Sequence, residues 1–247
     1  MKSLPLVLVP GLMCNQKVWE PLQAYFDKGQ ICQMVDHQSA NSLAQMAQQV
    51  LDTSPPLFVM AGHSMGGRVA LEVMRTAPER VAGIALLDTG YQAKAEGPSG
   101  ELEVNKRLAL LEIAQSKGVR AMAAEWVKGM VHPARLADSD FIEIIIKMFE
   151  TKNSDIFARQ LLALIFRNDA TEVLKAIRIP TLILCGEQDA WSPPSQHEEI
   201  LQYVPHAAYS LIANAGHMST MEKPVEVATA MNHWLEQCLC SSQRHNG

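Results

Sequence analysis

Short, continuous runs of apolar residues recur along this chain, and most are separated by segments with helical periodicity. Each run is long enough for one strand and too short for a typical helix. The runs cover residues 5–9, 31–35, 57–62, 81–88, 181–186 and 209–213. Helical patterns cover residues 43–51, 65–77, 194–204 and 222–239. Strands that are apolar on both faces and alternate with helices predict the α/β class, with a mostly parallel central sheet flanked by helices.

The alternation stops in the middle of the chain. Residues 91–176 contain helical stretches and no run that resembles a strand. The stretches cover residues 102–116, 119–130, 139–150, 154–166 and 171–176. A long insertion between the elements of one sheet is commonly a lid or cap over a functional site. We therefore expect one core domain, formed by residues 1–90 and 177–247, with a helical cap at residues 91–176 inserted into it.

The composition narrows the class of partner. Of the 247 residues, 48% are hydrophobic and 19% are charged, which is typical of a globular domain with a sizeable core. The net charge of −5 disfavours nucleic acid and anionic membranes as partners. No segment approaches the ~18 apolar residues of a membrane-spanning helix, and the N-terminus lacks the features of a secretory signal. The five cysteines have no disulfide-framework spacing, so we expect reduced thiols in a cytoplasmic protein.

Residues 61–67 read AGHSMGG, so that Ser64 stands between Gly62 and Gly66. The motif follows one predicted strand and opens a predicted helix, which is the context of a nucleophile elbow. In such a sharp turn the backbones crowd together, and glycine is the residue without a Cβ to clash. The first N–H groups of the helix are also left unpaired beside the serine. This context favours a nucleophile over a glycine-rich helix start that merely packs tightly.

A serine hydroxyl needs a general base, and His217 is the best-placed histidine. It follows the predicted strand 209–213, at the carboxyl edge of the sheet where Ser64 also lies. His63 is next to the serine but is interpreted as a packing residue, and His37 has no context that faces the serine. The other histidines fall on predicted helices, turns or the tail, and a surface or structural role is expected for His132, His197, His206, His233 and His245.

The base in turn needs a carboxylate that fixes its tautomer. Asp189 follows the predicted strand 181–186 at the same edge and is the favoured residue. Glu187, two residues earlier, is the first alternative. Asp88, at the end of the strand 81–88, is the second, although we otherwise interpret it as a capping or turn residue.

Taken together, these residues resemble the α/β-hydrolase superfamily, in its form as a small capped serine hydrolase or esterase. The order Ser64, Asp189, His217 is the order of that family, and the resemblance covers essentially the whole chain. By resemblance, residues 9–12 match the family's His-Gly-X loop, which implies an oxyanion hole formed by the backbone N–H groups of Leu12 and Met65. Pro10 stands where histidine is common, which leaves the hydrogen bonding of this loop open.

The resemblance implies hydrolysis of a carboxylic ester through an acyl-enzyme, with a small-molecule ester and water as partners. No cofactor or metal is expected, since no zinc-protease, Walker or dinucleotide fingerprint is present. Two alternatives stay open. One is a lactonase or carbon–carbon bond hydrolase with the same triad, and the other is a ligand-binding receptor that has kept the fold. The sequence does not indicate an oligomeric state.

The substrate depends on the cap and on residues beside the predicted acid and base. Apolar and aromatic side chains there are candidates to line a pocket for a small to medium, fairly apolar substrate. The candidates are Met122, Trp126, Met130, Phe149, Trp191 and Met218. For any one cap residue, burial in the core of the cap is the default interpretation. Cationic cap residues could also meet a substrate carboxylate, although a solvated helix face is favoured for Lys106, Arg107, Arg120, Lys128, Arg135 and Arg159.

Overall fold

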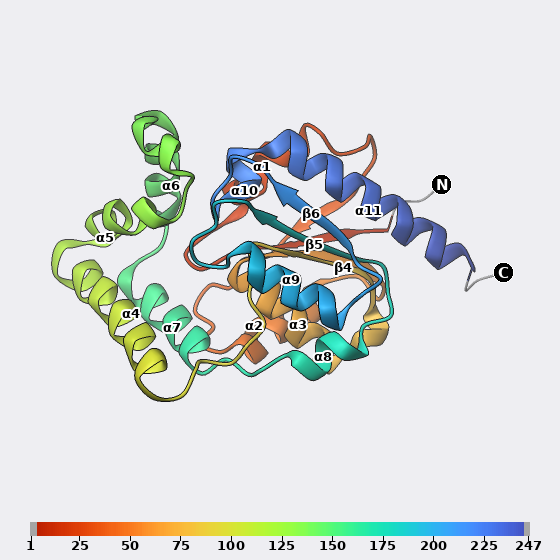
Figure 1. The fold of residues 1–247 in the computed structure, drawn as a ribbon, viewed down its shortest axis with the longest axis horizontal. Helices are drawn as coiled ribbons and strands as arrows, with labels where there is room; N and C mark the ends of the chain where they lie inside the picture. Colours follow the sequence, from red (N-terminus) through yellow and green to blue (C-terminus); the bar gives the residue numbers. More distant parts are fainter. Residues whose placement is uncertain (1–3, 245–247) are drawn as a thin grey trace.

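The computed structural model of this chain describes residues 4–244, and its centre is one six-stranded sheet (Figure 1). Every neighbouring pair of strands is parallel, in the order β2-β1-β3-β4-β5-β6. The strands are β1 (Leu6–Val9), β2 (Cys32–Met34), β3 (Phe58–His63), β4 (Val81–Leu87), β5 (Thr181–Gly186) and β6 (Ala208–Ile212). The predicted parallel α/β fold is therefore confirmed.

Burial explains why these runs form the sheet. Every residue of β1, β3 and β5 is buried, as expected for strands covered by helices on both faces. β6 lies at the edge and is mostly half-buried, and its sequence includes the polar Ser210. In the register of the sheet, Val9 lies opposite Gly62 at the carboxyl ends of β1 and β3. The loops that follow these strands therefore meet at one edge of the sheet.

Two layers of helices enclose the sheet (Figure 1). One face is covered by α2 (Leu43–Thr53), α3 (Met65–Thr76), α8 (Thr171–Ala176) and α9 (Pro194–Tyr203). The other face is covered by α1 (Glu20–Gln23) and α11 (Pro224–Arg244), and the short α10 (Ser219–Glu222) precedes α11. Each layer buries the apolar face of its helices against the sheet, as in other α/β folds.

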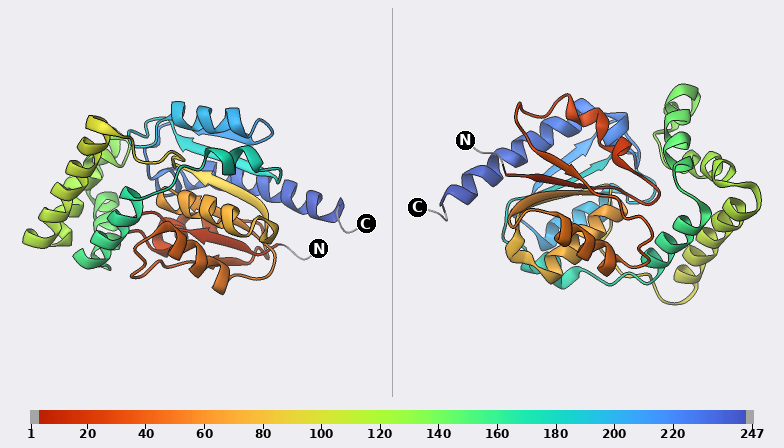
Figure 2. Two further views of the ribbon diagram at one scale, coloured as in Figure 1. Left: turned by 90° about the horizontal axis from the view of Figure 1, so that it is seen from below. Right: turned by 180° about the vertical axis from the view of Figure 1, so that it is seen from behind.

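The helical insertion lies beyond the carboxyl ends of the strands, as the views in Figures 1 and 2 show. It contains α4 (Gly97–Lys117), α5 (Val119–Trp126), α6 (Ser139–Glu150) and α7 (Ser154–Ile165). Two short 3₁₀ helices, η3 (Val127–Gly129) and η4 (Pro133–Ala137), follow α5. Gly118 separates α4 from α5 with a φ of 89°, a value that favours glycine.

The insertion differs from expectation in two places. α4 begins at Gly97 rather than at residue 102, because the Gly-Pro-Ser sequence starts the helix with a proline in its first turn. The helix expected over 119–130 ends at Trp126 and continues as the 3₁₀ turn η3. This turn brings the carbonyl of Met130 to the backbone N–H of His217, 2.8 Å away.

Two further properties concern membranes and thiols. Among the helices within residues 4–244, none combines the length and the apolar character that a membrane span requires. All five cysteines are free, and four of them are buried or half-buried.

Candidate active site

Ser64 sits at the tip of a strained turn between β3 and α3. Its φ and ψ are 54° and −118°, a combination that residues other than glycine rarely adopt and that costs free energy. A Cβ at Gly62 would overlap the backbone of Gly66, and a Cβ at Gly66 would overlap the carbonyl of Val9. The two glycines of the motif are thus required by the close approach of β1, β3 and α3.

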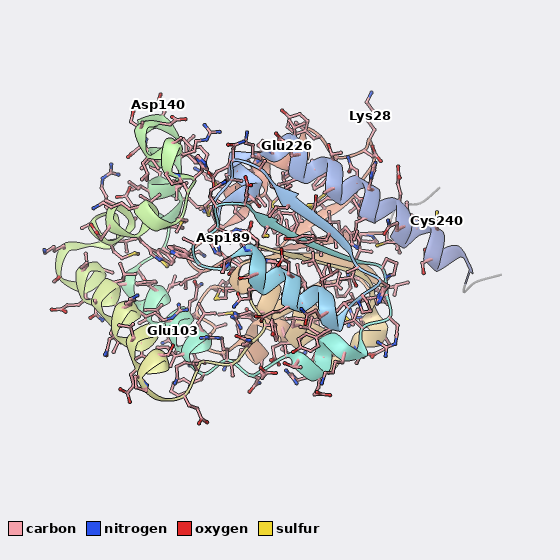
Figure 3. All side chains as sticks on the ribbon, viewed as in Figure 1. Lys28, Glu103, Asp140, Asp189, Glu226 and Cys240 are labelled. Carbon is pink, nitrogen blue, oxygen red and sulfur yellow. The ribbon has the colours of Figure 1, made fainter. Side chains whose placement is uncertain are left out.

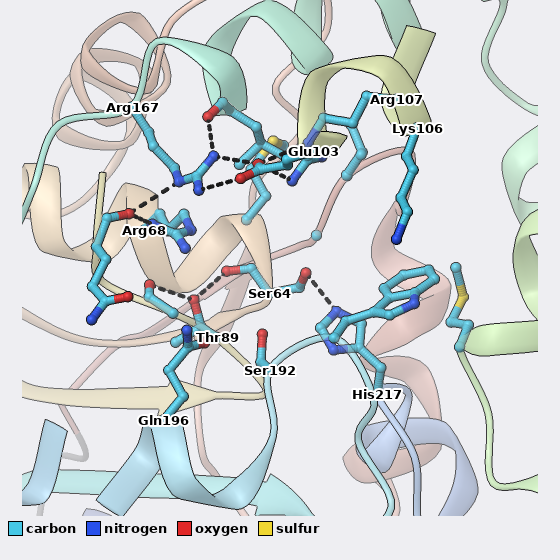
Figure 4. A pocket seen from close by; sticks show the side chains of 18 of the residues that line it. Ser64, Arg68, Thr89, Glu103, Lys106, Arg107, Arg167, Ser192, Gln196 and His217 are labelled. Carbon is cyan, nitrogen blue, oxygen red and sulfur yellow. Dashed lines mark hydrogen bonds and ion pairs between the residues drawn. The ribbon is translucent and has the colours of Figure 1, made fainter. Parts of the chain in front are cut away.

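Ser64, His217 and Asp189 form one chain of hydrogen bonds. The distance from Ser64 Oγ to His217 Nε2 is 2.7 Å (Figure 4). That from His217 Nδ1 to Asp189 Oδ2 is 2.8 Å. The second oxygen of Asp189 accepts the backbone N–H groups of Trp191 and Ser192, at 2.8 and 2.9 Å. The carboxylate therefore orients the imidazole while two backbone donors fix the carboxylate.

The charges of the site suit a base and its orienting acid. Burial alone would lower the pKa of His217, but the hydrogen-bonded Asp189 outweighs it and raises the pKa above the ordinary value. Burial likewise opposes ionisation of Asp189, but His217 and the two backbone donors lower the pKa of Asp189 overall. Each partner thus stabilises the charged form of the other. Asp189 lies at the edge of the core that faces the insertion (Figure 3).

A buried glutamate that the sequence analysis missed holds the loop of His217. Glu222, at the end of α10, accepts the backbone N–H of Gly216 at 2.9 Å and that of His132 at 2.8 Å. It is only 2% exposed. One side chain therefore fixes the residue before His217 and ties the insertion to the same loop.

The two alternative acids do not reach His217. Glu187 is exposed, and its carboxylate accepts the amide of Gln188. Asp88 is fully buried with a φ of 49°, and it accepts the Gly186 N–H at 2.9 Å and the hydroxyl of Ser219. Asp88 lies in a bend directly after β4, as expected of a turn residue, and both of its oxygens also link strands and loops inside the core.

The neighbouring histidines are buried, and two of them have partners. His63, expected to pack, also places Nε2 at 2.8 Å from the backbone oxygen of His217, so that it supports the base loop. His197 accepts the backbone N–H of Thr89 at 3.1 Å. Burial lowers the pKa of His63 to about 3 and that of His197 to about 4, so both are neutral near pH 7.

The residues expected to supply an oxyanion hole lie beside the serine. Leu12 and Met65 both line the cavity over Ser64. Among the hydrogen bonds of residues 4–244, none uses the backbone N–H of Leu12 or of Met65. The loop after β1 lacks the family's histidine and is held instead by the Gln160 side chain, which accepts the Met13 N–H at 2.8 Å. The loop is therefore anchored from α7, a contact that the sequence left open.

A cavity of about 650 Å³ lies over Ser64 and His217, between the core and the insertion. Four of the six residues expected in a pocket line it: Trp126, Met130, Trp191 and Met218. The expectation was wrong for Met122 and Phe149, which do not line the cavity because they are fully buried in the packing of the insertion. The ring of Trp191 lies 4.9 Å from that of His217 and stacks on Trp126 at 5.3 Å.

Cationic side chains line the same cavity. Lys106 and Arg107 do so, and Arg68 and Arg167, which the sequence analysis did not single out, do so as well. The other four cationic cap residues lie outside the cavity lining: Arg120, Lys128, Arg135 and Arg159. The first three pair with acidic neighbours on the surface, and Arg159 is exposed. The expectation of a solvated helix face thus holds for some of the cap cations and not for others. The part of the chain that the structure describes contains no cluster of side chains suited to a metal ion.

Comparison with known proteins gives a consistent assignment. Residues 6–230 match the family described as "Alpha/beta hydrolase family". A pimeloyl-[acyl-carrier protein] methyl ester esterase from Photobacterium profundum is 26% identical over 243 residues, which cover 94% of each chain. A Haemophilus influenzae protein, provisionally named an esterase/lipase, is 28% identical over 182 residues, which cover 72% of this chain but only 60% of that relative. A thermophilic esterase from Thermogutta terrifontis, solved with malate bound, superposes with a TM-score of 0.80 at 26% identity, covering 96% of this chain and 91% of the other.

Proposed function

This chain belongs to the alpha/beta hydrolase family, and we propose that it hydrolyses carboxylic esters through an acyl-enzyme formed on Ser64. The observation that carries the proposal is the hydrogen-bond chain Ser64–His217–Asp189, with distances of 2.7 and 2.8 Å. The esterase names of its relatives are consistent with an ester as substrate. In this reading, the helices of residues 91–176 act as a cap that encloses the substrate above Ser64.

The first half of the reaction acylates the serine. Ser64 Oγ attacks the ester carbonyl while His217 Nε2 takes its proton. In the proposed mechanism, the negative oxygen that forms accepts hydrogen bonds from the backbone N–H groups of Leu12 and Met65. Losing one such donor typically costs about 3 kcal/mol of transition-state stabilisation. Asp189 stabilises the imidazolium that His217 becomes during this step, and this matches the raised pKa of His217.

The second half regenerates the enzyme. His217 gives its proton to the leaving alcohol, and the C–O bond to that alcohol breaks. A water molecule then takes the place of the alcohol, His217 removes its proton, and the resulting hydroxide attacks the acyl carbonyl. The bond to Ser64 Oγ breaks, and the proton returns to the serine. The products are a carboxylic acid and an alcohol.

The test is steady-state hydrolysis of p-nitrophenyl esters, from acetate to octanoate, by the wild type and Ser64→Ala. We expect turnover by the wild type and a loss of about 10⁴-fold or more in kcat for the variant. The matched control is Ser116→Ala, because Ser116 is an exposed serine on α4. It should keep wild-type activity.

A second readout does not depend on finding the right ester. A fluorophosphonate probe should add its mass to the wild type at Ser64 and leave Ser64→Ala unlabelled. Turnover that persists in Ser64→Ala would refute the proposal. Labelling of Ser64 without any ester turnover would keep the activated nucleophile and reject ester hydrolysis as the function.

A further inference from the structure

One part of the cavity is strongly cationic, although the chain as a whole is acidic. Four cationic side chains line the cavity, and Glu103 is the only acidic residue in the lining within residues 4–244. The cavity lining therefore has a net charge of +3 with His217 neutral, whereas the whole chain has −5. Charge of one sign in a partly enclosed site attracts a ligand of the opposite sign.

Glu103 already forms ion pairs with two of these cationic side chains. Its two oxygens form a forked pair with Arg167, at 2.6 and 2.9 Å, and one of them accepts Arg107 Nε at 3.0 Å. Burial opposes ionisation of Glu103, but the two arginines outweigh it and lower its pKa to about 2. Glu103 thus stays ionised near pH 7 and holds Arg167 and Arg107 in place.

Arg68 has no such partner. Within residues 4–244 its guanidinium contacts no carboxylate, and its only hydrogen bond goes from Nη1 to the backbone oxygen of Gln92, at 2.8 Å. Burial, and then the guanidinium groups of Arg167 and Arg107, lower the pKa of Arg68 to about 9. Glu103 and Asp169 raise its pKa only in part, so Arg68 remains a cation near pH 7 without a carboxylate in direct contact.

A second polar group converges on the same place. A Cβ at Gly90 would come within 2.6 Å of both Arg68 Nη2 and Gln196 Oε1, so glycine leaves room for the two side chains. The hydrogen bonds of the described residues include none for Arg68 Nη2 or for the Gln196 side chain. Both residues line the cavity. A guanidinium N–H and the Nε2 group of a neighbouring amide can each donate to one oxygen of a carboxylate, once Gln196 turns Nε2 rather than Oε1 toward the site.

This cationic site lies next to the nucleophile. Arg68 is four residues after Ser64 on the first turn of α3, which corresponds to about 6 Å along a helix. Thr89, the neighbour of Gly90, donates its hydroxyl to the backbone oxygen of Ser64 at 2.6 Å. In Figure 4, Arg68 and His217 lie on opposite sides of Ser64. Because His217 protonates the leaving alcohol, the alcohol faces His217 and the acyl chain extends toward Arg68.

We propose that the natural substrate is an ester whose acyl part ends in a carboxylate, and that Arg68, assisted by Gln196, binds this carboxylate. The proposal rests on the ester hydrolysis proposed above. It names the substrate class as half-esters of short dicarboxylic acids, with the aromatic pair Trp126 and Trp191 on the alcohol side of the cavity. Arg107 and Arg167 add to the positive potential, and Glu103 keeps them apart from the substrate.

The test compares two methyl esters of the same shape. Monomethyl glutarate carries the carboxylate, and methyl glutaramate replaces it with a neutral amide. We expect kcat/KM of the wild type to be at least tenfold higher for the charged ester, as a charge-assisted hydrogen bond commonly provides. In Arg68→Gln this ratio should fall at least fivefold, and Arg68→Lys should retain part of it.

The matched control is Arg120→Gln, which removes the same charge outside the cavity lining. Arg120 is 54% exposed and pairs with Glu143 and Glu150 on the surface of the insertion. The ratio of kcat/KM for the charged ester to that for the neutral ester should be the same in Arg120→Gln as in the wild type. A wild-type ratio near one, or an equal fall of the ratio in Arg68→Gln and Arg120→Gln, would overturn the proposal and leave ester hydrolysis standing.

A binding measurement separates this proposal from the proposed function. If neither ester is hydrolysed, calorimetric titration of the same proteins with monomethyl glutarate still shows whether Arg68 binds a carboxylate. Binding to the wild type and to Arg120→Gln that is lost in Arg68→Gln would support the carboxylate site, although ester hydrolysis had failed. Absence of binding to the wild type, or equal binding to all three proteins, would reject the site. Thermal unfolding of Arg68→Gln and Arg68→Lys shows whether each variant is folded.

Discussion

Replacement of Glu222 by alanine tests whether one buried carboxylate holds the base loop in place. The change would remove the acceptor of two backbone N–H groups, those of Gly216 and His132, which are 2.9 and 2.8 Å from the carboxylate. A buried donor that loses its only partner costs about 1–3 kcal/mol. The Gly216 N–H is in fully buried surroundings, whereas that of His132 is partly accessible to water. We therefore expect Glu222→Ala to lower the free energy of unfolding by about 2–4 kcal/mol.

Glu222→Gln should cost less than the alanine variant. Its amide keeps one acceptor oxygen but presents an NH₂ group to the second backbone donor, so about one hydrogen bond is lost. Burial raises the pKa of Glu222, more than its backbone donors lower it. The buried charge is therefore itself unfavourable, and its removal offsets part of the loss. We expect a destabilisation of about 1–2 kcal/mol for Glu222→Gln.

The assay is urea unfolding at pH 7, with kcat/KM measured on the same preparations. Glu236→Gln, an exposed glutamate in the middle of α11, is the control and should stay within about 0.5 kcal/mol of the wild type. Both Glu222 variants should also lose activity, because the imidazole of His217 depends on this loop for its position. A free energy of unfolding for Glu222→Ala within about 0.5 kcal/mol of the wild type would refute the reasoning.

Three further substitutions or measurements test the site. Because only neutral His217 is a base and its pKa is raised above the ordinary 6.5, kcat/KM should fall as the pH drops through that pKa. Asp189→Asn should move this fall in kcat/KM to lower pH. A fall at the same pH in the variant would argue against Asp189 as the cause of the raised pKa. Asp189→Asn should also lower kcat by about 10⁴-fold, whereas Asp88→Asn should stay within about tenfold of the wild type, and comparable losses would contradict the choice of acid. Gly66→Ala should destabilise the fold by at least about 2 kcal/mol, since its Cβ would overlap the Val9 carbonyl, and a thermal midpoint within about 2 °C of the wild type would contradict this.

The strands could be predicted from the sequence because each is a continuous apolar run. β5 has the predicted bounds, Thr181–Gly186, and is buried along its whole length. β6 lies one residue earlier than predicted, since an edge strand is bounded by hydrogen bonds more than by burial. The start of α4 was missed because Gly97 and Pro98 usually indicate a turn, yet a proline in the first turn satisfies the geometry of a helix.

The residues placed around Ser64 could be predicted only where the signal is local. The motif around Ser64, and the position of His217 after a strand, are visible in short segments of sequence. The contacts of Glu222 and Arg68 are not, since Glu222 reaches His132 across 90 positions and the neighbours of Arg68 come from the insertion and from α9. Helical periodicity shows that Arg68 belongs to a helix, but it does not show that this face of the helix opens into a cavity.

The choice between Asp88 and Asp189 shows why a sheet edge alone does not identify an acid. Both residues follow parallel strands that end at the same edge, so the sequence allows either one near His217. The structure distinguishes the two residues by the hydrogen bonds that their carboxylate oxygens accept. One oxygen of Asp189 accepts backbone N–H groups of its own loop, and the other is hydrogen-bonded to His217. Asp88 accepts Gly186 on one oxygen and Ser219 on the other, and neither oxygen is hydrogen-bonded to His217.

The surroundings then shift the pKa values of these two carboxyl groups in opposite directions. Burial, and after it the nearby charge of Asp189, raise the pKa of Asp88 well above its ordinary value. The surroundings therefore oppose the charged form of Asp88 and favour the charged form of Asp189 beside His217. Two carboxylates that were both ionised this close together would repel each other in a low-dielectric interior. The network around Asp88 thus favours a single negative charge at this edge of the sheet. That charge is on Asp189, next to the imidazolium of His217.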